Sequence, residues 1–129
     1  MISTDTLQIR SLAHIGDAVY EVFAREVTCL KTENPKKLHA ITVSIVNAKF
    51  QADLLEILEP ILTAQEQDIV RRARNLAVTT ARRVNHTQHR LSTAFEALIG
   101  YLYFNDKERL NEIYKHITPA VEKQLTPAE

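Results

Sequence analysis

The sequence contains very little glycine and cysteine, and these two shortages limit the classes of protein to which the chain can belong. Only two of its 129 residues are glycine, and Cys29 is its single cysteine. One cysteine excludes an internal disulfide and favours a reducing compartment. No apolar run approaches the roughly 20 residues of a membrane span, and the first ten residues lack the apolar core of a secretory signal. We therefore expect a soluble, cytoplasmic protein.

The chain also lacks the patterns that define several protein classes. It shows no strand-like alternation, no internal repeat, and no nucleophile elbow, P-loop or dinucleotide fingerprint. Its five histidines are scattered without a nearby cysteine, which argues against a zinc site. With 45% hydrophobic and 25% charged residues, the composition is that of an ordinary globular protein. We expect one domain over residues 1–129.

Apolar residues recur at spacings of three and four through most of the chain, which predicts an all-α fold. The first helix is expected to begin near a cap at Asp5 and to end before Asn34, and Pro35 fits the first turn of the second. The third helix should end at Pro60. Thr63 should begin the fourth helix with a capping box.

The second half of the chain is less regular. Residues 85–87, Asn-His-Thr, are predicted to lie in a loop. A fifth helix is expected over residues 93–104, with a cap at Ser92 or the next residue. Because this segment is apolar on nearly all sides, it should be central. Asp106 should cap a last helix, and the tail from about residue 118, which contains two prolines, is expected to fray.

Each glycine stands near a carboxylate inside an apolar, helical segment. Gly16 precedes Asp17, and Gly100 follows Glu96 by four residues. Glycine inside a helix costs about 1 kcal/mol relative to alanine, and a carboxylate on an apolar face costs more unless it is paired or holds a metal. Close packing of two helices through the glycines would explain both features.

In that arrangement Asp17 and Glu96 converge on one polar site. Two adjacent carboxylates repel each other, and a hard divalent cation such as Mg²⁺ (or Mn²⁺ in its place) removes the repulsion. The alternative is that each carboxylate pairs with an arginine from another helix. Patterning by itself leaves both interpretations open.

The net charge is zero, but the charges are segregated along the chain. Residues 71–90 carry six arginines and no acid, whereas residues 51–70 carry five acids and no base. The basic segment is either a solvated face that balances the acids or a surface that contacts phosphates. No aromatic residues interleave with the arginines, which favours a duplex over a single strand. The candidate RNA contacts are Arg72, Arg74, Asn75, Arg82, Arg83 and, less strongly, Lys49.

Two of these segments resemble a known family. IGDAVYE, which contains Asp17, resembles the signature helix of ribonuclease III enzymes, and FEALIG, which contains Glu96, resembles their second acidic signature. Their order and separation agree over nearly the whole chain. VNAKFQADLL and the basic RRARN resemble the mini-ribonuclease III branch, which has the catalytic domain without a separate double-stranded-RNA-binding domain.

The resemblance implies a homodimeric, Mg²⁺-dependent endoribonuclease that cleaves double-stranded RNA and matures large-subunit (23S) ribosomal RNA precursors. It also implies that Asp17 and Glu96 are the catalytic residues and the metal ligands. Full-length ribonuclease III carries further acids at the positions of Arg10, Ala13 and Thr93. The reduced acidic set, which the mini branch shares, leaves fewer ligands for a second metal ion.

Two other functions are compatible with the same sequence. The chain could be a non-catalytic module that binds duplex RNA on the same fold. It could also be a helical adaptor whose basic segment meets an acidic protein partner. Loss of Mg²⁺-dependent cleavage in Asp17→Asn, with duplex binding retained, would distinguish an enzyme from both alternatives.

Overall fold

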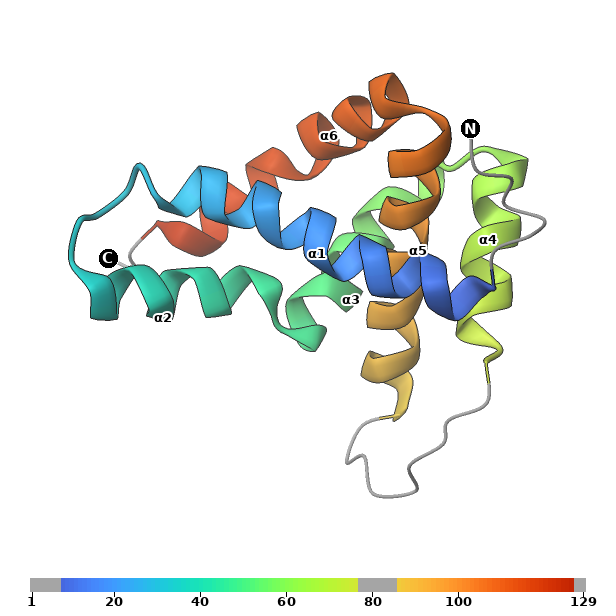
Figure 1. Ribbon diagram of the computed structural model, residues 1–129, viewed down its shortest axis with the longest axis horizontal. Coiled ribbons are helices and arrows are strands. Elements are labelled where there is room, and N and C mark those ends of the chain that lie inside the picture. Colours follow the sequence, from blue (N-terminus) through green and yellow to red (C-terminus); the bar gives the residue numbers. More distant parts are fainter. Residues whose placement is uncertain (1–7, 77–85, 127–129) are drawn as a thin grey trace.

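The computed structural model describes residues 8–76 and 86–126, and within these ranges it is helical with no strand (Figure 1). The all-α prediction is therefore confirmed. None of the described helices is long and apolar enough to cross a membrane. In chain order the elements are α1 (Ile9–Thr28), α2 (Pro35–Val46), α3 (Ala48–Leu58), the 3-10 helix η1 (Glu59–Ile61), α4 (Ala64–Arg74), α5 (His86–Asn105) and α6 (Lys107–Leu125).

Helix α5 forms the centre of the fold. It packs against α1, α3, α4 and α6, and Figure 1 shows α1 crossing it near the middle of the molecule. Residues from Ala94 to Leu102 are buried with the exception of Glu96, which is only partly covered. A helix that is apolar on nearly all sides must be enclosed by others. The central position predicted for this segment is thus confirmed.

Several helix ends follow local capping chemistry, and the caps at Thr63 and Asp106 were predicted. The side chain of Asn34 accepts hydrogen bonds from the backbone of Lys36 and Lys37 at the start of α2. Thr63 and Glu66 form the expected capping box at the start of α4. Asp106 caps α6 through the backbone N–H of Arg109.

The predicted start of α5 is wrong. Residues 86 and 87 are helical and not part of a loop, and Ser92 lies inside the helix and not at its cap. The hydroxyl of Thr93 donates to the carbonyl of His89 in the preceding turn. Residues 86–91 are exposed or half-buried, so they extend the buried helix that begins at Ser92, where packing against other helices outweighs weak propensity. The expected cap at Asp5 and the remaining loop residue, Asn85, lie outside the described residues.

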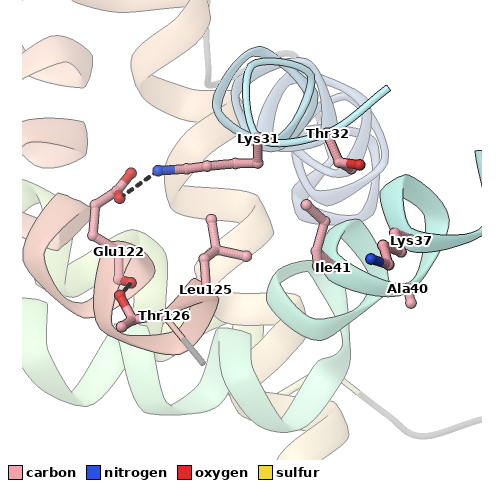
Figure 2. Close-up of a pocket in the computed structure, with 8 residues that line it drawn as sticks. All are labelled: Lys31, Thr32, Lys37, Ala40, Ile41, Glu122, Leu125 and Thr126. Atoms are coloured by element: carbon pink, nitrogen blue, oxygen red, sulfur yellow. Dashed lines mark hydrogen bonds and ion pairs between the residues drawn. The ribbon is translucent and has the colours of Figure 1, made fainter. Parts of the chain in front are cut away.

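The predicted fraying from residue 118 is also wrong. Helix α6 continues to Leu125 with Pro119 in its interior. Ile117 and Val121, on either side of the proline, are completely buried. Their burial outweighs the hydrogen bond that proline cannot donate. Near the end of the helix, Glu122 pairs with Lys31 at 2.8 Å across a shallow pocket between α2 and α6 (Figure 2).

A partly buried ion pair joins α6 to the start of α4. Arg109 Nε lies 2.9 Å from Glu66 Oε2, and Arg109 also donates to the carbonyl of Ile61 at 2.8 Å. Burial by itself would raise the pKa of Glu66. The hydrogen bonds from Arg109 and Thr63 and the charge of Arg109 outweigh this effect, so the pKa is lowered. The pair fixes the acidic end of α4 against the core.

Candidate active site

The crossing of α1 and α5 depends on both glycines. A Cβ atom at Gly16 would overlap the carbonyl oxygen of Glu96, and one at Gly100 would overlap the carbonyl oxygen of Leu12. Neither glycine has a positive φ, so the requirement is space and not backbone conformation. The predicted close approach of the two helices through Gly16 and Gly100 is confirmed.

The same crossing brings Asp17 and Glu96 together. Asp17 is exposed on α1, next to Gly16, whereas Glu96 is partly covered on α5. The two side chains are close enough to share a hydrogen bond. Among residues 8–76 and 86–126, neither carboxylate forms an ion pair with a lysine or arginine. Nearby Glu21 pairs with Arg25, which is four residues along α1.

This environment holds a proton on Glu96. Burial, together with the hydrogen bond to Asp17 and the negative charge of Asp17, raises the pKa of Glu96 to about 8, and a hydrogen bond with Gln51 opposes the shift only in part. Adjacent carboxylates cannot both ionise cheaply unless a cation neutralises them. The two oxygen-rich side chains therefore fit a hard divalent cation, which commonly uses one or two carboxylates and retains several waters.

The acidic set is small, as the sequence indicated. No group of three or more His, Cys, Asp or Glu side chains gathers within the parts of the chain that the structure describes. Ala13 is buried and Thr93 bonds to its own helix, so neither supplies a further carboxylate. Asp17 and Glu96 would have to hold a cation with water completing its coordination.

A third polar side chain, Gln51, completes the site from α3. It is 1% exposed and it hydrogen-bonds to Glu96. The hydroxyl of Ser92 donates to Gln51 Oε1 at 2.5 Å. A buried amide without partners would cost about 1–3 kcal/mol, and these contacts satisfy it. Ser92 and Glu96 stand one turn apart on α5, so one amide from α3 meets both.

Sequence reasoning missed Gln51 and Ser92. Gln51 stands three, four and seven residues before Leu54, Leu55 and Leu58, which places a polar side chain on the apolar face of α3. A polar residue on an otherwise apolar helix face is the sequence signal that could have identified Gln51. Ser92 was interpreted as a cap because serine is common at that position.

Of the six predicted RNA contacts, four lie on described helices or at their ends and two lie outside the described residues. Arg72, Arg74 and Asn75 are exposed at the end of α4. Arg72 lies 3.8 Å from Asp68 and Arg74 lies 4.0 Å from Glu59, so part of their charge is balanced locally. Lys49 on α3 pairs with Asp53 at 3.2 Å. Arg82 and Arg83 lie outside the described residues.

Comparisons with known proteins agree with this geometry. The ribonuclease III domain family matches residues 10–107, a range that includes both carboxylates. A mini-ribonuclease 3 from Gloeobacter violaceus is 45% identical over 114 residues, which is 84% of each chain. A mini-ribonuclease 3 from Symbiobacterium thermophilum is 40% identical over 121 residues, which is 92% of this chain and 93% of the relative.

A solved structure shares the fold as well. The crystal structure of a Fusobacterium nucleatum protein superposes with a TM-score of 0.81 at 29% identity, and the match covers 93% of this chain and 96% of that one. The family match, the curated relatives and the all-helical fold point to the same family. The chain therefore belongs to the ribonuclease III family and is an endoribonuclease.

Proposed function

We propose that this protein is a Mg²⁺-dependent endoribonuclease that cleaves the double-stranded regions of large-subunit (23S) ribosomal RNA precursors in the cytoplasm. Its observed basis is the pairing of Asp17 with Glu96 at the α1–α5 crossing without a basic partner among the described residues. The mini-ribonuclease 3 relatives, which match most of the chain, support the same activity.

Asp17 and Glu96 are the proposed catalytic metal ligands. Mg²⁺ bound between them would supply activation of water and stabilisation of charge on a phosphoryl group. Asp17 is exposed and therefore accessible to a substrate, whereas Glu96 is partly covered and held by Gln51. Glu96, whose pKa is raised to about 8, gives up its proton when it binds the cation, which couples occupancy of the site to pH.

The arginines at the end of α4 are proposed to position the RNA backbone. Arg72 and Arg74 are exposed, and guanidinium groups bind phosphates in a bidentate manner. Arg72→Ala together with Arg74→Ala should weaken duplex binding and reduce the slope of log affinity against log salt by about 1.4 to 1.8. A titration of labelled duplex RNA at several salt concentrations measures both quantities. An unchanged slope would contradict contact with phosphates at these positions.

A homodimer is part of the proposal. Two-fold symmetry would place one site near each strand of a duplex. Val22 on the signature helix α1 is 60% exposed and lines a pocket with Val19 and Phe23, which makes this apolar surface the candidate contact between subunits. Sedimentation equilibrium should return twice the mass of the chain, and Val22→Glu should shift the equilibrium toward monomer.

The decisive test is cleavage of structured duplex RNA with and without Mg²⁺. The intact protein should cut a duplex fragment of precursor 23S RNA only in the presence of the metal, and single-stranded RNA of the same composition should survive. Asp17→Asn and Glu96→Gln should each abolish cutting but retain duplex binding in a gel-shift assay. Duplex binding without cutting by the intact protein, with Mg²⁺ or Mn²⁺, would favour the non-catalytic module. Absence of any RNA binding would favour the protein adaptor.

A further inference from the structure

Gln51 is a buried amide that bridges two residues of the central helix. It comes from α3 and meets Ser92 and Glu96, which stand four residues apart on α5. A glutamine side chain has an acceptor end and a donor end, so its orientation decides what it offers to each partner. Only one orientation satisfies both partners when Glu96 is ionised.

The ionised carboxylate, which can only accept, selects that orientation, and the Ser92 hydroxyl supports it as a donor. This hydroxyl donates to Gln51 Oε1 at 2.5 Å, which directs the amide nitrogen to the Glu96 carboxyl group. The amide nitrogen can then donate to an ionised carboxylate, the form in which Glu96 would bind a cation. Ser92 therefore donates to Gln51, and Gln51 donates to Glu96.

We propose that Gln51 is a positioning residue, which holds the Glu96 carboxylate in the orientation that binds a divalent cation, and that Ser92 fixes the Gln51 amide. This inference rests on the metal-binding role of Asp17 and Glu96 in the proposed function. Groups that hydrogen-bond to metal ligands typically change metal affinity by 10- to 100-fold when they are removed. Gln51 acts through Glu96 and does not contact the cation.

Packing by itself does not require an amide at this position. Gln51 shares its face of α3 with Leu54, Leu55 and Leu58, all of which are completely buried. An apolar side chain of similar length would fill the same space. It would leave the Ser92 hydroxyl without this partner, which costs stability but does not by itself change the metal affinity. A packing role and a positioning role therefore predict different outcomes for Gln51→Met.

The test is a calorimetric titration of metal-free protein with Mn²⁺, without RNA. Gln51→Met should lower the Mn²⁺ affinity by about 10- to 100-fold, and its thermal unfolding without metal should remain cooperative. Ser92→Ala should lower the affinity by a smaller factor, because the amide keeps its donors but loses the contact that orients it. The matched control is Gln124→Met, on the exposed end of α6, which should bind Mn²⁺ as the unaltered protein does.

The results separate failure of this inference from failure of the proposed function. If the unaltered protein binds Mn²⁺ and both Gln51→Met and Ser92→Ala bind it equally well, the positioning role is overturned while the metal site stands. If Asp17→Asn also leaves Mn²⁺ binding unchanged, the metal site itself is overturned. Should Gln51→Met fail to fold, Ser92→Ala decides the question by the same titration.

Discussion

Gly16 of α1 lies against the backbone of Glu96 in α5, so closely that a methyl group at Gly16 would overlap the Glu96 carbonyl oxygen. The residue next to Gly16 is Asp17, whose side chain meets that of Glu96. The contact that sets the spacing of the two helices and the contact that forms the acidic pair therefore involve the same two turns. A substitution that changes the spacing of α1 and α5 here would therefore also move the two carboxylates.

Gly16→Ala should destabilise the protein. In an exposed helix the same change would stabilise by about 1 kcal/mol. Here the added Cβ forces α1 away from α5, and we expect a loss of about 3 kcal/mol or more in the free energy of unfolding. Urea denaturation measures the change. Ser11→Ala, at an exposed position of α1, is the control and should change stability by less than about 0.5 kcal/mol. A stabilised Gly16→Ala variant would contradict the close crossing.

Asp17→Asn should make the metal-free protein more stable while it removes activity. The substitution deletes the charge that repels Glu96 but preserves the size and the hydrogen-bonding capacity of the side chain. We expect a higher midpoint of thermal unfolding at pH 8 in EDTA, measured by circular dichroism. Glu21→Gln, which breaks the exposed pair with Arg25, is the control and should leave the midpoint unchanged or slightly lower. A lower midpoint for Asp17→Asn would show that the two carboxylates do not repel each other.

Acid should selectively weaken the Glu66–Arg109 contact. The pKa of Glu66 is lowered from 4.5 in the folded protein, so its ion pair contributes stability above pH 4.5. That contribution disappears as the pH falls through the folded-state pKa. Glu66→Gln can keep the capping box but lacks the charge, and should cost about 2 kcal/mol at pH 7. Urea unfolding of both proteins from pH 7 to pH 3 should show the difference shrinking with acid. A constant difference across this range would refute the assignment.

Ile117→Ala should destabilise the protein strongly, because α6 is still packed into the core at the point where the sequence suggests fraying. The side chain is completely buried and directly precedes residue 118. Loss of a buried isoleucine side chain costs about 2–5 kcal/mol. Ile57→Ala, at a position that is 40% exposed, is the matched control and should cost less than about 1.5 kcal/mol. Equal effects of the two substitutions in urea denaturation would indicate that the end of α6 is loosely held.

Local chemistry explains which helix ends could be predicted. Asn34, Thr63 and Asp106 cap helices through contacts within a few residues, and such contacts are visible in the order of the amino acids. The start of α5 and the end of α6 were predicted wrongly for the opposite reason. The end of α6 is helical because Ile117 and Val121 are buried against other helices, which propensity cannot register. The first turns of α5 are exposed or half-buried and extend the buried helix that follows them.

The sequence by itself determined the helical class, the caps and the two glycine–carboxylate segments that identify the family. Helical periodicity, capping side chains and the scarcity of glycine are local properties, and each has a direct physical cost or benefit along the chain. They favoured a site shared by Asp17 and Glu96 and left open whether a cation or arginine partners neutralise the two carboxylates.

The surroundings of Asp17 and Glu96 were decided only by the tertiary structure. Gln51 comes from a third helix, and its contacts with Ser92 and Glu96 span more than 40 residues of chain. Burial of Glu96 beside Asp17, which raises its pKa, likewise follows from the crossing of α1 and α5. A buried polar group is acceptable only when partners reach it from other elements, and the positions of those partners are fixed by packing.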